Sequence, residues 1–88
     1  NNCLIQGQIN LPTTSIGGNG GLEKTINAAK SGYTPIGIIG WYITGTRASY
    51  VTMPNLRISG ENIIVYFRCN NSAGASISGF FSVLYKKK

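Results

Sequence analysis

The chain is almost without acids and bases. Among its 88 residues there is no His, and the acidic residues are Glu23 and Glu61 alone. General acid–base catalysis and metal-assisted hydrolysis depend mainly on His, Asp and Glu side chains held close together. The two glutamates are far apart in the sequence, so nothing indicates the carboxylate pair that a glycosidase needs. We therefore expect a protein that is not an enzyme and that carries no cofactor.

Cysteine is scarce as well, with only Cys3 and Cys69. Two cysteines without His or nearby carboxylates cannot fill a tetrahedral metal site, and they lack a base that would make a thiolate nucleophile. The strand alternation described below places both on inward faces. A disulfide between them would close a long loop and contribute about 3 to 5 kcal/mol. The alternative is two buried reduced thiols.

Long apolar runs are also missing. The sequence has no stretch of about 18 or more apolar residues, and no charged segment followed by an apolar leader opens it. We therefore expect no membrane span, and no signal peptide is visible. The chain starts Asn1-Asn2-Cys3 without a Met, and we expect residues 1–88 to be a single domain, the C-terminal part of a longer protein.

The small size of the chain predicts a small core. A chain of this length buries only about 60 to 65% of its unfolded surface, so its stability is marginal without further help. Help can come from a disulfide, a metal or a partner chain. With a metal disfavoured by the composition, partner subunits are the leading candidate. We expect a homo-oligomer.

What the sequence does contain is the period-two pattern of half-buried strands. Near the start, Ile5, Ile9 and Leu11 fall on one face and polar side chains on the other, until Pro12 stops the run. Later strands repeat the pattern, with inner faces formed by Ile63, Val65, Phe67 and Cys69 and by Ile77, Phe81, Val83 and Tyr85.

Turn residues divide the chain into about seven such segments. The glycines in residues 15–21 indicate a flexible loop or turn, and Gly37 and Gly40 indicate a bulge or a close backbone approach. Residues 22–29 fit helix or strand, and we favour strand. The expected strands are residues 2–11, 22–29, 36–44, 49–52, 56–59, 63–69 and a last one around 77–85. They predict an all-β fold, a small antiparallel β-sandwich or jelly-roll-like module.

Three segments carry a resemblance to a known family: residues 32–41 (GYTPIGIIGW), 56–60 (LRISG) and 82–86 (SVLYK). Together they resemble small C-terminal modules of tail-fibre, baseplate or other minor structural, receptor-binding proteins in phages of Gram-positive bacteria. The resemblance would run from about residue 20 to the end of the chain. None of these segments carries chemistry.

The resemblance implies an all-β module at the distal end of a phage appendage, often trimeric, that meets the host surface or holds the fibre together. The implied location is the virion, with the host cytoplasm during assembly. We therefore expect a phage tail fibre or receptor-binding domain that mediates attachment to the host cell, to a glycan or an anionic wall polymer. A purely structural virion module, for fibre trimerisation or capsid decoration, is the alternative.

Two adjacent aromatics are the first candidates for a ligand site. Trp41 and Tyr42 follow each other on an expected strand, so they point to opposite faces and at most one lies in the core of a single sheet. An exposed aromatic can stack on a sugar ring or anchor a protein contact. The alternative is that both are buried, one inside the sandwich and one against a neighbouring subunit.

Arg47 and Tyr50 are the other candidates, in the turn that follows. A loop-borne Arg and an aromatic can meet a ligand, and the guanidinium suits the carboxylates or phosphates of anionic wall polymers. The alternative is ordinary solvated loop decoration.

The net charge of +6 allows a third function. Half of the excess lies in Lys86, Lys87 and Lys88 at the C-terminus, which indicates a solvated tail or attraction to an anionic partner. A basic and aromatic face from Arg57, Tyr66 and Arg68 (residues that would share paired strands) would suit a small nucleic-acid-binding barrel. Nucleic acid is the least favoured of the partners.

Overall fold

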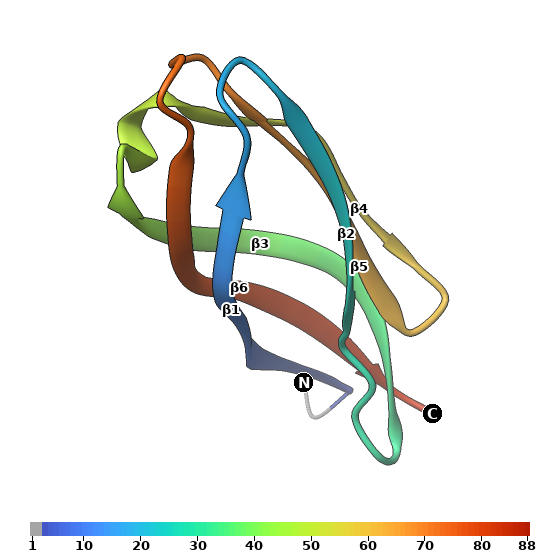
Figure 1. The fold of residues 1–88 in the computed structure, drawn as a ribbon. Helices are drawn as coiled ribbons and strands as arrows, with labels where there is room; N and C mark the ends of the chain where they lie inside the picture. The colour runs from blue at the N-terminus through green and yellow to red at the C-terminus, as the bar shows by residue number, and fades with distance from the viewer. Residues whose placement is uncertain (1–2) are drawn as a thin grey trace.

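The computed structural model describes residues 3–88, which form two antiparallel three-stranded sheets packed as a sandwich (Figure 1). The six strands of this part of the chain are β1 (Leu4–Ile16), β2 (Gly21–Asn27), β3 (Tyr33–Thr46), β4 (Val51–Ser59), β5 (Asn62–Cys69) and β6 (Ala75–Lys87). A short 3-10 turn, η1 (Ala48–Tyr50), links β3 to β4, and residues 3–88 hold no α-helix. The predicted all-β antiparallel sandwich is confirmed, with six strands instead of about seven.

Each sheet has one central strand and two edges. Sheet A has the order β1-β6-β3, and sheet B has the order β2-β5-β4. Only the β4–β5 connection is a hairpin within one sheet; the other connections described cross between the sheets. Four of the six strands are therefore edge strands, and the sandwich is open along both sides.

The core lies between the two central strands, as the alternation predicts. Ile63, Val65, Phe67 and Cys69 of β5 are fully buried. They face the inner side chains of β6, which are Ile77, Phe81, Val83 and Tyr85 and are no more than 1% exposed. The predicted strand at residues 22–29 is also confirmed as β2, with Ile26 opposite Ile63 in the ladder.

Two predicted strand boundaries are wrong, both because of bulges in edge strands. Pro12 does not end the first strand: β1 runs on to Ile16 through a bulge between Leu11 and Thr14. The missing N–H of a proline is tolerated at such a position on an edge. The hydroxyl of Thr14 donates a hydrogen bond to the carbonyl of Pro12 at 2.8 Å.

The segments predicted as strands at 49–52 and 56–59 are one strand. They are joined in β4 across a bulge at Met53 and Pro54, between Thr52 and Asn55 in the register with β5. Residues 49 and 50 belong to the 3-10 turn instead. This merger accounts for the lower number of strands.

The glycines at 37 and 40 mark bulges, as predicted. The register of β3 against β6 shifts between Pro35 and Gly37 and again between Ile38 and Gly40. Ile36 and Ile39 are the extra residues of these bulges, and they are 48% and 49% exposed. β3 is thus an edge strand whose two irregularities interrupt its backbone ladder.

The Gly-rich connection between β1 and β2 is a tight turn packed against the β5–β6 connection. Asn19 N donates to Asn71 O at 3.1 Å, and Gly20 N donates to Gly17 O at 3.0 Å. A Cβ at Gly18 would overlap the backbone carbonyl of Ser72. The glycine is needed here because two backbones touch. Of the two expected forms, a flexible loop or a turn, the structure has a hydrogen-bonded turn.

Cys3 and Cys69 lie near opposite ends of β6, and no disulfide joins these two described residues. The Cys3 carbonyl accepts a hydrogen bond from Lys87 N at 2.8 Å, whereas Cys69 Sγ lies 3.6 Å from Asn71 O, just before β6 begins. Of the two alternatives, the structure does not form the bridge, because the long strand β6 separates the two residues. The predicted inward position holds for Cys69, which is buried, and not for Cys3, which is exposed.

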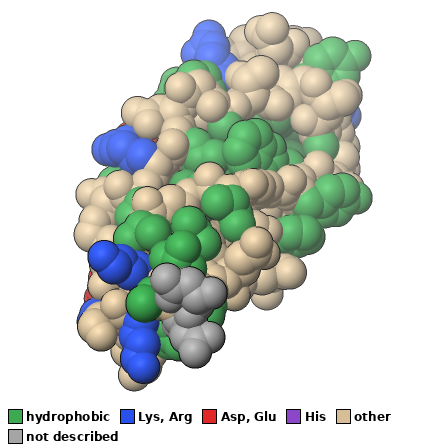
Figure 2. Space-filling model, turned by 180° about the vertical axis from the view of Figure 1, so that it is seen from behind, with side chains coloured by type: hydrophobic (Ala, Val, Ile, Leu, Met, Phe, Trp, Pro, Cys, Tyr) green, Lys and Arg blue, Asp and Glu red, His purple; other side chains and the backbone are tan. Residues whose placement is uncertain are grey.

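Few charged side chains lie in the middle of the face seen in Figure 2. Seen from behind, Lys and Arg lie mostly along one edge and at the ends of the molecule, and hydrophobic side chains are exposed across the middle (Figure 2). Lys88 Nζ lies 3.7 Å from Glu61 Oε2, an ion pair between exposed side chains. In the described residues, no helix is long and apolar enough to cross a membrane.

One buried hydrogen bond closes the C-terminal end of the core. Tyr85, 1% exposed, donates its hydroxyl to the carbonyl of Ala28 at 2.6 Å, and Ala28 is itself fully buried. Burial raises the pKa of Tyr85 above the ordinary tyrosine value of 10.0. The bond joins the connection between β2 and β3, which contains Ala28, to the end of β6.

We predict that Tyr85→Phe lowers the free energy of unfolding by about 1 to 2 kcal/mol, because the Ala28 carbonyl loses its buried donor. The wild-type pKa is raised in the folded state, so ionisation favours the unfolded chain. The contribution of Tyr85 to the free energy of unfolding is thus complete below a pH of about 10 and is lost as the pH rises above it. Urea unfolding across this range should show that the free energy of unfolding falls less steeply with pH in Tyr85→Phe than in the wild type. Exposed Tyr42→Phe is the control, and an unchanged slope in Tyr85→Phe would contradict the prediction.

Candidate functional site

Sheet A bends in its middle, where the backbones of β6 and β3 approach closely. β6 changes direction sharply along its length (Figure 1). Gly79 lies within this strand with φ 151°, and a Cβ there would overlap the carbonyl oxygen of Tyr42 on β3. The bulge of β1 starts at Leu11, directly opposite Gly79. The bend therefore depends on a missing side chain in the central strand and an extra residue in the edge strand.

Next to the bend, three side chains form a row across the outer face of sheet A. Phe80 of β6 is opposite Asn10 of β1 on one side and opposite Tyr42 of β3 on the other. Directly opposed residues of antiparallel strands point to the same face. The rings of Tyr42 and Phe80 lie 5.9 Å apart, tilted by 36°. An amide and two aromatic rings are thus presented side by side.

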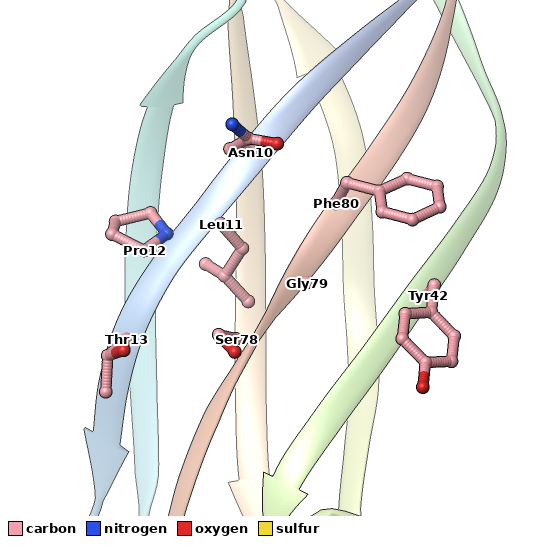
Figure 3. Close-up of a pocket in the computed structure, with 8 residues that line it drawn as sticks. All are labelled: Asn10, Leu11, Pro12, Thr13, Tyr42, Ser78, Gly79 and Phe80. Atoms are coloured by element: carbon pink, nitrogen blue, oxygen red, sulfur yellow. The ribbon is translucent and has the colours of Figure 1, made fainter.

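This row borders an open hollow, which we call the sheet A hollow. Its volume is about 660 Å³, and its lining residues are Asn10, Leu11, Pro12, Thr13, Tyr42, Ser78, Gly79 and Phe80. Figure 3 shows the Phe80 ring projecting toward β3, above the ring of Tyr42, with Asn10 and Pro12 across from them on β1. None of the lining residues is charged. The hollow offers ring faces, an amide and hydroxyl groups, the groups that fix a neutral polar ligand.

The same face continues beyond the hollow without charge for two further rows. Gln8, Ser82 and Gly40 are opposite one another, followed by Gln6, Leu84 and Gly37. β1 therefore contributes a ladder of three amides, and β3 contributes two positions without side chains. A charged residue first appears in the following row, at Lys86.

Of the predicted ligand-binding residues, Tyr42 alone lies in the sheet A hollow. Tyr42 and Trp41 point to opposite faces, as predicted, because Tyr42 is opposite the outward Phe80 and Trp41 is opposite the buried Phe81. Both are nevertheless exposed in the single chain, by 56% and 55%. Trp41 stays exposed on the inward side because β3 is an edge strand.

Trp41 lines a second depression, which we call the side groove. It runs between the edges β3 and β4, with a volume of about 520 Å³, and is lined by Ile36, Gly37, Ile38, Trp41, Met53, Pro54, Leu56, Arg57 and Ile58. Arg57 is the single charged residue in this set. The groove thus exposes the margin of the hydrophobic core.

Arg47 and Tyr50 lie apart from both depressions, at η1. The Arg47 guanidinium donates hydrogen bonds to the backbone carbonyls of Gly74 and Ala73, the second at 3.4 Å. Arg47 therefore fastens the turn before β6. Tyr50 is 48% exposed, and its carbonyl accepts a hydrogen bond from Asn70 N at 2.9 Å. The structure does not bring these two residues together with Trp41 or Tyr42 in one site.

Arg57, Tyr66 and Arg68 do share one face, the outer face of sheet B. Tyr66 is opposite Asn55, Arg68 is opposite Thr52, and Arg57 is opposite Ile64, all pointing away from the core. Glu23 of β2 is opposite Tyr66 on the same face. Its carboxylate lowers the positive potential that a nucleic acid would need.

Two residues of the hollow, Asn10 and Phe80, are missing from the predicted ligand site. Alternation places both on the outer faces of their strands, and the pair Phe80–Phe81 repeats the signal of Trp41–Tyr42, adjacent aromatics of which one must point outward. That signal places Phe80 on an outer face, where it is half-buried. It does not identify its neighbours, which come from strands far away in the sequence.

Among residues 3–88, no three His, Cys, Asp or Glu side chains lie together in a possible metal site. Comparison with family models, with curated protein sequences and with solved structures found no match for the chain. The resemblance to phage modules stays a prediction.

We predict that Gly79→Ala lowers the free energy of unfolding by about 2 to 4 kcal/mol, since backbone strain and overpacking each cost about 1 to 3 kcal/mol. Urea denaturation measures the loss. The control is Gly17→Ala, where a Cβ meets nothing within 4 Å and the change should stay within about 0.5 kcal/mol. Equal losses of unfolding free energy in Gly79→Ala and Gly17→Ala would contradict the close approach of the β6 backbone to β3 at Gly79.

Proposed function

We propose that the chain is a non-catalytic module of a phage tail fibre or receptor-binding protein. It attaches the virion to the surface of a Gram-positive host cell and works as a homo-oligomer. The all-β fold is compatible with this function, and the segments at residues 32–41, 56–60 and 82–86 suggest the phage origin. The proposal rests on one structural observation, the sheet A hollow and the two rows next to it on the outer face of sheet A, which carry no charged residue.

The sheet A hollow supports a sugar as the ligand. The tilted rings of Tyr42 and Phe80 offer apolar faces on which the C–H face of a sugar ring can stack. Asn10, Ser78 and Thr13 supply an amide and two hydroxyl groups around them. Such uncharged, adaptable hydrogen-bonding groups next to aromatic anchors are typical of surfaces that bind other molecules.

The charge distribution favours a neutral glycan over an anionic wall polymer at this position. No Lys or Arg lines the hollow, although the chain has eight of them. A phosphate or carboxylate in the hollow would lose water without gaining a cationic partner. An anionic polymer would bind better at the Lys-rich C-terminal end.

A purely structural role in the virion is the second candidate. The observation that favours it is the side groove, an apolar surface suited to packing against another subunit. This role needs no ligand and leaves the sheet A hollow without a function. The exposure of Tyr42 in the single chain supports attachment, and the exposure of Trp41 is compatible with either role.

Substitution of the two exposed tyrosines tests the attachment proposal. We predict that Tyr42→Ala weakens binding to a glycan array by about tenfold or more, because a central aromatic anchor is lost. The array should carry neutral bacterial polysaccharides and teichoic acids. Binding to the neutral polysaccharides should change little with salt, because no charges are paired.

The matched control is Tyr50→Ala, which removes a tyrosine that is 48% exposed but lies outside the hollow, and it should bind as the wild type does. Equal losses in both variants would contradict a site in the hollow. Absence of binding to any glycan would contradict attachment and leave the structural role.

A further inference from the structure

The two open sides of the sandwich, one with the edge strand β2 and one with the edge strand β4, differ in how they are protected against contact with other chains. On β5, the buried Val65 is opposite Lys24 of the edge strand β2 and opposite Leu56 of the edge strand β4. An inward-pointing lysine at an edge is a means by which proteins prevent contact with other chains. The β2 side thus carries a charge at the margin of the core, whereas the β4 side carries a leucine at the same level.

Among the described residues, the β3–β4 side has no inward-pointing lysine, and apolar side chains are exposed along it. Trp41 points inward yet is 55% exposed, and Leu56 and Ile58, opposite the fully buried Val65 and Ile63, are only half buried. Ile36, which lines the side groove, and Ile39 project from the bulges of β3. The core of the single chain therefore ends at an uncovered apolar margin.

From this asymmetry we infer that the side groove is a self-association surface, covered by a second copy of this chain. Ile36 and Trp41 line the groove and Ile39 projects from the neighbouring bulge of β3, so each copy presents one continuous apolar surface there. A rotation axis near β3 can bring this surface of one copy against that of another, as a closed symmetric oligomer requires. Contact by side chains is favoured over strand pairing, because the two bulges of β3 interrupt its free edge.

Charge also favours a second copy. The chain carries +6 overall, so two copies repel unless they meet where cations are few. Arg57 is the single charged residue that lines the groove, whereas Lys86 and Lys87 lie at the far end of β6, opposite the start of β3. A nucleic acid or an acidic peptide would need more than one cation in the groove, and a second copy needs none.

This inference rests on the homo-oligomer in the proposed function, and its test uses no ligand, so the two can fail separately. A monomer that binds glycans would contradict the interface and the homo-oligomer and would leave attachment standing. An oligomer that binds no glycan would contradict attachment alone.

The experiment combines sedimentation equilibrium with fluorescence of Trp41, which is the one tryptophan of the chain. We expect the full chain to sediment as a multiple of its 9.4 kDa mass. On dilution to monomer, the emission should shift to the red as Trp41 becomes exposed to water. Trp41→Lys should raise the dissociation constant by about 30-fold or more, as for a central aromatic of an interface.

The matched control is Tyr42→Lys, the neighbouring position on the opposite face with nearly equal exposure, which should associate as the wild type does. Ile39→Lys, in an exposed bulge, provides a second interface variant in case Trp41→Lys does not fold. A wild-type chain that stays monomeric at high micromolar concentration with unchanged emission would overturn the inference. So would an oligomer that neither Trp41→Lys nor Ile39→Lys weakens.

Discussion

The close approach of two backbones at Gly79 is the constraint on which the outer face of sheet A depends. Any side chain at this position would overlap the Tyr42 carbonyl and push β3 away from β6. The ring of Tyr42 would then move away from Phe80, since the two are opposite each other in the same ladder. The bend, the ring pair and the hollow are consequences of one missing side chain in the central strand.

In a small sandwich with four edge strands, the exposed edges can pair with strands of other chains unless something prevents it. Bulges interrupt three of the edges described here, β1, β3 and β4, and an inward lysine lies on the fourth, β2. These devices discourage indiscriminate strand pairing. They leave one side, between β3 and β4, where the apolar margin is exposed without a lysine. The two proposed activities thus use different surfaces of the same strand β3, with Tyr42 on one face and Trp41 on the other.

Local patterns predicted the strands well, because burial on one face imposes a period of two. The inner faces of β5 and β6 follow from alternation alone, and the glycines at 37 and 40 predict the bulges of β3. The strand boundaries predicted at Pro12 and near Pro54 were wrong, because a proline ends a central strand but is tolerated in a bulge at an edge. Which strand lies at an edge is decided by long-range pairing, which the local sequence does not contain.

The candidate site was harder to predict for the same reason. Tyr42 was identified from its aromatic neighbour, but Asn10 and Phe80 join it only through the registers of three strands far apart in the sequence. Arg47 resembled a ligand-binding loop residue, and its contact with the carbonyls of residues 73 and 74 depends on tertiary structure. The sheet A hollow, lined by amide, hydroxyl and aromatic groups, agrees with the scarcity of acids and bases in the sequence.

The central claim is that the uncharged hollow on the outer face of sheet A holds a neutral glycan. The most direct test is to titrate the isotopically labelled chain with neutral wall polysaccharide fragments and to follow the backbone and side-chain amide signals by NMR. The account predicts that the largest shifts fall on Asn10, Tyr42 and Phe80, extend to Gln8, and leave the outer face of sheet B unchanged. Shifts centred on Arg57 and Arg68, or on the C-terminal lysines, would contradict it.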